Sequence, residues 1–156
     1  MVNVRPFQLS DYAQVTDVMR NALSELCFTE TLDAFGRQLS WDSSLVLVAE
    51  VEENSPVIDR STYSYDGRII GLAIGTIDHD VGYHYRIAVD PQHRRRGVAR
   101  KLIHSMQQRF EQRKVKRILI PLDQHNALAL PVFESLGFGA QQFTKAWKKL
   151  SIVAKR

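Results

Sequence analysis

The segment that most constrains the fold runs from Ile87 to Ile103 and reads IAVDPQHRRRGVARKLI. An apolar strand ends at Asp90-Pro91, and a helical apolar stripe begins just after Gly97, at Val98, Leu102, Ile103, Met106 and Phe110. A strand, a basic turn and a helix therefore follow one another directly. The first turn of a helix leaves backbone N–H groups without intrahelical partners, and its partial positive charge attracts anions. This order predicts a phosphate or pyrophosphate site at the start of the helix.

The basic residues of the chain are concentrated in and after this turn. The 156 residues carry 21 Lys and Arg against 17 Asp and Glu, a formal charge of +4. Between His93 and Arg117 there is one acid, Glu111, against ten Lys or Arg residues. Such a segment is typical of a pocket for a phosphorylated small molecule, of a nucleic-acid surface, or of the solvated face of a helix. No aromatic residues are interleaved with the loop arginines, which disfavours the nucleic-acid surface.

Composition limits the remaining possibilities. A chain with 44% hydrophobic and 24% charged residues is typical of one domain, which we expect to cover residues 1–156. The single cysteine, Cys27, excludes an intrachain disulfide framework, and no His-x-x-x-His pair occurs, so no metal site is expected. No apolar stretch is long enough to span a membrane, and the N-terminus lacks the plan of a secretory signal. We therefore expect a cytoplasmic protein without a membrane partner.

The pattern of apolar residues predicts an α+β domain. Strands are expected at residues 2–7, 44–51, 68–78, 83–90, 117–123 and 141–150. Helices are expected at residues 11–23, capped by Ser10, and at 29–39, 97–112 and 126–136. Pro131 should delay or kink the last helix, and Gly71 and Gly75 indicate a bulge or a close backbone approach. On its strand, His84 should face the side opposite Tyr83 and Tyr85, in a structural role.

Two spaced motifs resemble those of a known family. Arg94 to Ala99 reads Arg-x-x-Gly-x-Ala and resembles the Arg/Gln-x-x-Gly-x-Gly/Ala pyrophosphate loop of the GNAT superfamily of acetyl-CoA-dependent N-acetyltransferases. Asn126-x-x-Ala129-x-x-x-Phe133-Glu134-x-x-Gly137-Phe138 is similar to that family's Asn-x-x-Ala-x-x-x-Tyr-Glu-x-x-Gly-Phe segment. The opening VRPFQLSDY also resembles the family, so the likeness covers nearly the whole chain. No Walker-type loop and no GxGxxG motif occurs.

The resemblance implies an α/β/α layered, GNAT-like acyl-CoA N-acyltransferase fold, with a mixed central sheet of about six or seven strands and about four helices. It implies transfer of an acetyl group from acetyl-CoA to a primary amine of a small molecule or peptide, by direct attack in a ternary complex, in a monomer or homodimer. The backbone of the strand ending at Val89 would pair with the pantetheine arm. The cofactor-binding residues implied are Ile87, Ala88, Val89, Arg94, Arg95, Arg96, Gly97, Val98, Ala99, Arg100, Asn126 and Phe133.

The chain departs from the family pattern at its proton-transfer residues. Phe133 stands where the family has the Tyr that protonates the leaving thiolate, and the family's frequent Glu base falls on Tyr83 or Pro121. A water held by Tyr83, Tyr85 or a nearby acid could serve as base. The sequence therefore leaves two alternatives beside the enzyme, a CoA- or acyl-CoA-binding protein with little or no turnover and a basic nucleic-acid-binding domain. It does not identify the acceptor amine.

Overall fold

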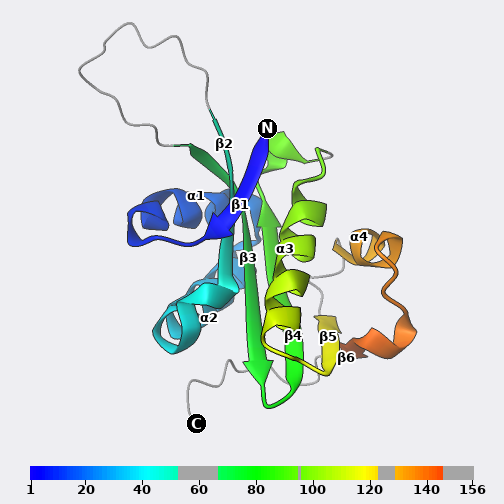
Figure 1. The fold of residues 1–156 in the computed structure, drawn as a ribbon. Helices are drawn as coiled ribbons and strands as arrows, with labels where there is room; N and C mark the ends of the chain where they lie inside the picture. The colour runs from blue at the N-terminus through cyan, green and yellow to red at the C-terminus, as the bar shows by residue number, and fades with distance from the viewer. Residues whose placement is uncertain (53–66, 95, 123–128, 146–156) are drawn as a thin grey trace, which may run out of the picture.

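A mixed sheet of six strands forms the centre of the domain (Figure 1). The computed structural model describes residues 1–52, 67–94, 96–122 and 129–145. The strands follow one another across the sheet in sequence order, as β1 (Val2–Pro6), β2 (Val46–Val51), β3 (Arg68–Asp78), β4 (Val81–Val89), β5 (Arg117–Leu122) and β6 (Phe143–Lys145). The first four pair antiparallel, and β5 and β6 are added in parallel. The sheet is therefore an antiparallel meander of four strands followed by two parallel strands.

Apolar residues of the inner strands pack on both faces of the sheet. In β2, Val46 and Val48 belong to one buried cluster, whereas Leu47 and Ala49 belong to the cluster on the other face. A strand buried on both faces has a continuous run of apolar residues. This explains why apolar and polar residues do not alternate in residues 44–51, SLVLVAEV. The sheet is therefore the middle layer of three, as the fold prediction required.

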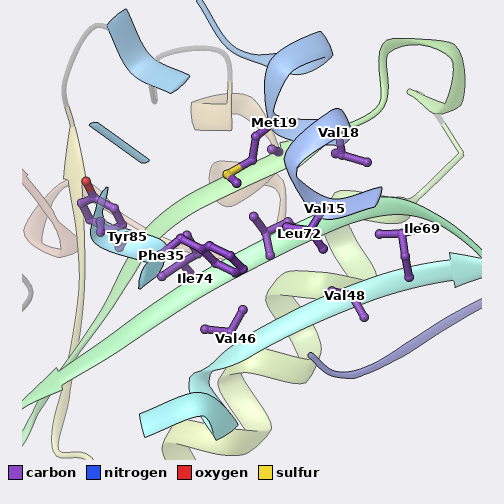
Figure 2. Packing of buried hydrophobic residues seen from close by; sticks show 12 residues of the cluster. Val15, Val18, Met19, Phe35, Val46, Val48, Ile69, Leu72, Ile74 and Tyr85 are labelled. Atoms are coloured by element: carbon purple, nitrogen blue, oxygen red, sulfur yellow. The ribbon is translucent and has the colours of Figure 1, made fainter. Parts of the chain in front are cut away.

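Four α-helices complete the described layers. The first face is covered by α1 (Tyr12–Ala22) and α2 (Glu25–Asp42), whose Val15, Met19 and Phe35 meet β2 and β3 in the cluster shown in Figure 2. The opposite face is covered by α3 (Val98–Gln112), with the predicted stripe buried. The short α4 (Leu130–Ser135) packs through Phe133 against α3 and β5. No described helix has the length and apolarity needed to cross a membrane.

Glycines in β3 and β4 let α3 approach the sheet closely. A Cβ built on Gly82 would lie 2.9 Å from Cδ1 of Phe110, and one on Gly75 would lie 2.6 Å from Sδ of Met106. Gly75 also adjoins a shift in the β3–β4 register. Both readings of this glycine, a bulge and a close approach, are confirmed. The close packing fixes the height of α3, and therefore of its N-terminus, above the sheet.

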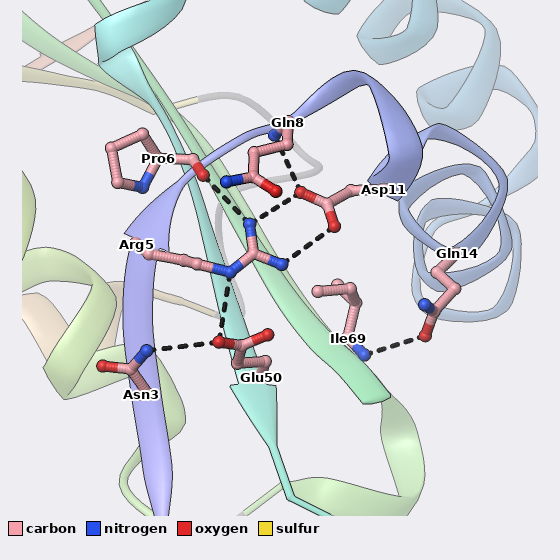
Figure 3. A network of polar contacts seen from close by, with 8 residues as sticks. All are labelled: Asn3, Arg5, Pro6, Gln8, Asp11, Gln14, Glu50 and Ile69. Atoms are coloured by element: carbon pink, nitrogen blue, oxygen red, sulfur yellow. Dashed lines mark hydrogen bonds and ion pairs between the residues drawn. The ribbon is translucent and has the colours of Figure 1, made fainter. Parts of the chain in front are cut away.

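The start of α1 differs from the prediction, because a polar network takes the place of the Ser10 cap (Figure 3). Asp11 is the N-cap residue, and its carboxylate accepts bonds of 2.8 and 2.9 Å from Arg5 and one of 2.8 Å from Gln8 N. Arg5 also pairs with Glu50 at 3.1 Å. Burial alone would raise the pKa of Asp11, but the bonds from Arg5 and Gln8 outweigh it and the pKa is lowered. The network joins β1, β2 and α1.

Other boundaries can be compared with the sequence pattern in the same way. The second helix begins at Glu25 rather than at residue 29, because Ser24 caps it by accepting a bond from Cys27 N. The last helix begins late, at Leu130, with Pro131 in its first turn, as expected from the missing N–H of proline. The predicted final strand is described only as far as Lys145, and the rest of it lies outside the described residues.

Candidate active site

The two central parallel strands separate along their length. The β4–β5 pairing consists of Val81 with Arg117, Gly82 with Ile118, and Tyr83 with Leu119. Beyond Tyr83, β4 continues to Val89 without a β5 partner among the described residues. Backbone groups on this side of Ile87–Val89 are therefore available to an added strand or strand-like ligand.

A bulge lies in β4 just where the strands separate. Ile74 pairs with Arg86 and the next residue, Gly75, pairs with His84, so Tyr85 is an extra residue in β4. Both Tyr85 and Arg86 consequently face the helices α1 and α2. Tyr85 joins their apolar cluster, and Arg86 Nε donates to Thr31 Oγ1 of α2 at 3.1 Å. The bulge thus changes which side chains the end of β4 presents.

A groove of about 620 Å³ runs from this open edge of β4 to the N-terminus of α3. Its walls come from the end of α1, from β4, from α3 and from the region of α4. Eight of the predicted cofactor-binding residues line it, namely Ile87, Ala88, Val89, Arg94, Gly97, Val98, Ala99 and Arg100. Local sequence order explains this, because a strand, turn and helix that follow one another directly share one end of the sheet.

The N-terminus of α3 is shaped for an anion. Gly97 is its N-cap, with φ of 76°, and a Cβ at this position would have nothing within 4 Å. The left-handed backbone favours glycine, and the open space beside it allows a ligand to come close to the backbone. The helix is 15 residues long, so its unpaired N–H groups carry the full partial charge of a helix terminus.

The loop arginines are placed differently from one another. Arg94 reaches across to the end of α1, with Nη2 3.5 Å from the Ala22 carbonyl oxygen, and Arg100 donates to Ser135 Oγ of α4 at 2.8 Å. Arg96 is exposed and is not among the residues that line the groove. Arg95 and Asn126 lie outside the described residues. Two guanidinium groups, those of Arg94 and Arg100, are therefore present on the described walls of the groove.

Phe133 lies in the core beneath the groove rather than on its lining. Its ring is 3% exposed and packs at right angles against Phe138, with centroids 5.4 Å apart. The neighbouring ring is His84, on the α3 side of the sheet, with its centroid 5.3 Å from that of Phe133. Burial lowers the pKa of His84 to about 4, although the bond between Nε2 and Gln107 Oε1, at 2.7 Å, opposes this. The imidazole is therefore neutral near pH 7.

The two tyrosines predicted to hold a catalytic water are not among the groove-lining residues. Tyr85 is 8% exposed beneath the Arg86 guanidinium, whose Cζ lies 5.2 Å from the ring centroid. Tyr83 is partly buried. Within the described residues, no group of three or more side chains of the metal-ligating types comes together.

Of the described groove-lining residues that the sequence did not predict, His93 is the one with an imidazole side chain. His93 lines the groove immediately before Arg94, and its Nδ1 faces Asp90 Oδ2 at 3.8 Å. The family motif begins at the following residue, so it gives no role to position 93. Its position in the basic turn was the one sequence signal that could have predicted a role for His93.

Comparison with known proteins agrees with this geometry. The model of the acetyltransferase (GNAT) family matches residues 17–138. Among solved structures, the ribosomal-protein-S18-alanine N-acetyltransferase from Escherichia coli is 22% identical, with a TM-score of 0.62 over 89% of this chain and 78% of that one. PaiA N-acetyltransferase from Thermoplasma acidophilum, in complex with coenzyme A, is 14% identical, with a TM-score of 0.66 over 89% and 90%. The aminoglycoside N-acetyltransferase AAC(6′)-Iy, in complex with CoA, is 19% identical, with a TM-score of 0.63 over 94% and 98%. The chain belongs to the GNAT acetyltransferase family.

Proposed function

We propose that this chain transfers the acetyl group of acetyl-CoA to a primary amine by direct attack in a ternary complex. The observation that carries the proposal is the continuity of one groove from the open edge of β4 to the Gly97 turn of α3. An extended amide-containing arm fits the first part, and a pyrophosphate fits the second. The CoA-bound structures among the solved relatives support the same occupant.

The groove residues suit the separate parts of CoA. Apolar side chains from Ile87 to Val89 line the part proposed for the pantetheine arm, whose amides would bond to the β4 backbone. Arg94, Arg100 and the α3 N-terminus offer charge-assisted donors to phosphate oxygens. We assign Arg95, Arg96 and Asn126 to the same ligand on the family motif alone.

The reaction forms a nitrogen–carbon bond and breaks the carbon–sulfur bond of the thioester. Acetyl-CoA supplies the electrophilic carbonyl group and, as CoA thiolate, the leaving group. In the proposal, a backbone N–H near Val89, at the open edge of β4, donates to the carbonyl oxygen as negative charge develops on it. The attacking amine must lose a proton, and we assign this to a water held by Tyr83, Tyr85 or an acid, all of which lie outside the described lining of the groove.

A second candidate is a protein that binds CoA or acyl-CoA with little or no turnover. Phe133 has no proton to donate, and its ring is part of the core. Among the described residues that line the groove, none carries a carboxylate. Within the described part of the groove, the usual acid and base of the family are therefore missing, whereas the binding surface is present.

The deciding experiment measures binding and turnover on the same preparation. Calorimetry with CoA reports binding, and a thiol-reactive dye reports release of CoA when acetyl-CoA is mixed with panels of amines. Binding with amine-dependent thiol release supports the enzyme. Binding without release on any amine supports the second candidate, and a folded protein that binds no CoA contradicts both.

Gly97→Glu tests the placement of the pyrophosphate. The carboxylate would enter the space beside the left-handed turn and repel the phosphates, so CoA binding should be lost. Gly36→Glu is the matched control, because Gly36 is an exposed glycine of α2 whose Cβ would also meet nothing within 4 Å. Undiminished CoA affinity in folded Gly97→Glu would refute the placement.

A further inference from the structure

The His93 ring has two nitrogens in different surroundings. The side chain is 13% exposed and lines the groove beside Arg94 and Gly97. Nδ1 is buried and has no hydrogen-bond partner within the described structure. Nε2, in contrast to Nδ1, is not a buried nitrogen without a partner. It belongs to the accessible part of the ring, which faces the groove. One nitrogen is therefore turned inward and the other outward.

The inward nitrogen faces a carboxylate that the backbone holds in place. Asp90 is 7% exposed, its Oδ1 accepts a 2.9 Å bond from Gln92 N, and its own N–H donates to Ile70 O of β3 at 2.8 Å. His93 N closes the same turn on Asp90 O at 2.8 Å. Asp90 Oδ2 then lies 3.8 Å from His93 Nδ1 and 3.6 Å from Arg68 Nη2. The ring and the carboxylate thus belong to one hydrogen-bonded turn.

We propose that His93 is a further phosphate-binding residue of this groove, which donates from Nε2 to a CoA pyrophosphate oxygen when the ring carries both protons, with Asp90 as its positioning residue. This inference rests on the proposed function, because it takes CoA as the occupant. A doubly protonated ring gives the buried Nδ1–H a carboxylate to face and gives Nε2–H an anion. The proton that binds with CoA comes from solvent, and no other bond changes.

The charged groups around the ring determine how the proposal can be tested. In the described residues they are Asp90 and Arg94 of the same turn, Arg68 of β3 behind Asp90, and Arg100 of α3 on the groove wall. The arginines keep their charge at every accessible pH. A change in CoA affinity between pH 6 and pH 8 that depends on residue 93 therefore reports on a proton bound at this imidazole.

The test compares CoA dissociation constants of the wild type and His93→Gln at pH 6 and pH 8. Gln keeps a neutral donor and removes the proton-dependent charge. We expect roughly tenfold weaker CoA binding by His93→Gln at pH 6, as for loss of one charge-assisted bond, and a difference of less than about threefold at pH 8. His104→Gln, at an exposed position of α3 outside the groove, should match the wild type at both pH values.

Two further measurements separate binding from a structural effect. Pantetheine lacks the phosphates, so NMR titration should give equal pantetheine affinities for the wild type and His93→Gln. Calorimetry of the wild type with dephospho-CoA, in two buffers of different ionisation enthalpy, should show net proton uptake near pH 7 without a contribution from the 3′-phosphate. Asp90→Asn keeps an acceptor for Gln92 N and should reduce this uptake.

The inference is wrong if His93→Gln weakens CoA binding by the same factor at both pH values, or weakens pantetheine binding as much as CoA binding. Absence of proton uptake by the wild type overturns it without any variant. A folded wild type that binds no CoA at either pH overturns the proposed function as well, which distinguishes the two failures.

Discussion

Acidification should destabilise this domain through one buried imidazole. His84 is 3% exposed, lies between β4 and α3, and has its ring centroid 5.2 Å from that of Phe110. Burial lowers its pKa from 6.5 to about 4, only partly opposed by the bond to Gln107. The folded state therefore excludes a proton that the unfolded chain accepts readily.

The sign and size of the effect follow from these two pKa values. Because the pKa is lower in the folded state, the full stability is present above about pH 6.5 and is lost as the pH falls toward about 4. At pH 5 the unfolded state is mostly protonated and the folded state mostly neutral at this residue. Between pH 6.5 and pH 5, an interval of about 1.5 pH units, the unfolded state gains a proton that the folded state does not. At about 1.4 kcal/mol per pH unit, this lowers the free energy of unfolding by about 2 kcal/mol.

Urea unfolding followed by circular dichroism at pH 7.5 and pH 5 measures this loss. His84→Gln removes the titration and retains a group that can bond to Gln107, so the variant should lose about 2 kcal/mol less than the wild type between the two pH values. His104→Gln, on the exposed face of α3, should lose as much as the wild type. The reasoning is refuted if the wild type and His84→Gln lose the same free energy of unfolding over this interval.

The carboxylates with lowered pKa values do not obscure this result. Asp11 and Asp42 contribute little at pH 5 because these groups stay largely ionised in both the folded and the unfolded state.

Three substitutions test the packing and the polar network. Gly82→Ala places a methyl group against Phe110 and should destabilise the domain by roughly 1–3 kcal/mol in urea unfolding, whereas Gly36→Ala, at an open helical site, should be neutral or stabilising. Gly97→Ala should lower stability by about 1 kcal/mol through the left-handed backbone alone, and an unchanged unfolding midpoint would contradict the turn geometry. Arg5→Ala leaves the shielded Asp11 carboxylate without its partner and should cost roughly 2 kcal/mol, less than for a fully buried pair. A double-mutant cycle with Asp11→Ala should recover a coupling energy, and additivity would show that the pair contributes nothing.

Sequence pattern predicted the strands better than the helix starts. The bounds of β3 match the expected strand because its apolar run is bounded by turn residues at both ends. The start of α2 was misplaced because Ser24 and Thr29 are both good capping residues with an acid directly after them. Burial of Cys27 and Thr31 against the core decides between them, and that packing is not visible in the local sequence.

The Ser10 prediction failed for a different reason. Asp11 was available as a cap in the sequence, but its real role depends on Arg5 of β1 and on Glu50 of β2, far along the chain. A pairing across that separation follows from the register of β1 against β2, in which Asn3 faces Glu50. Local propensities contain no information about this register.

Some features of the candidate site follow from local sequence, and others depend on strand pairing. The Gly97 turn and the arginines could be predicted because strand, turn and helix are consecutive in the sequence. The separation of β4 from β5 and the extra residue at Tyr85 depend on strand pairing. The inward placement of His93 depends on Asp90 being fixed to β3. The motif therefore predicted the Gly97 turn and the lining residues Ile87–Val89, but it did not predict the strand separation, the extra residue at Tyr85 or the position of His93.

The positions of Phe133 and His84 bear on how a thiolate could leave this groove. Their rings contact each other and Phe138, with centroids 5.3 to 5.8 Å apart, so the position at which the family has a tyrosine is part of the aromatic cluster that buries the imidazole. With the pKa of His84 at about 4, this imidazole is neutral near pH 7 and is not available as a cationic general acid. Of the described groove-lining side chains, His93 is the one with an imidazole ring, and it lies beside the Gly97 turn rather than in the middle of the β4 edge. In the proposed reaction we therefore expect the CoA thiolate to be protonated by solvent, and the rate of acetyl transfer to depend on the acidity of that thiol more steeply than in a relative with the tyrosine.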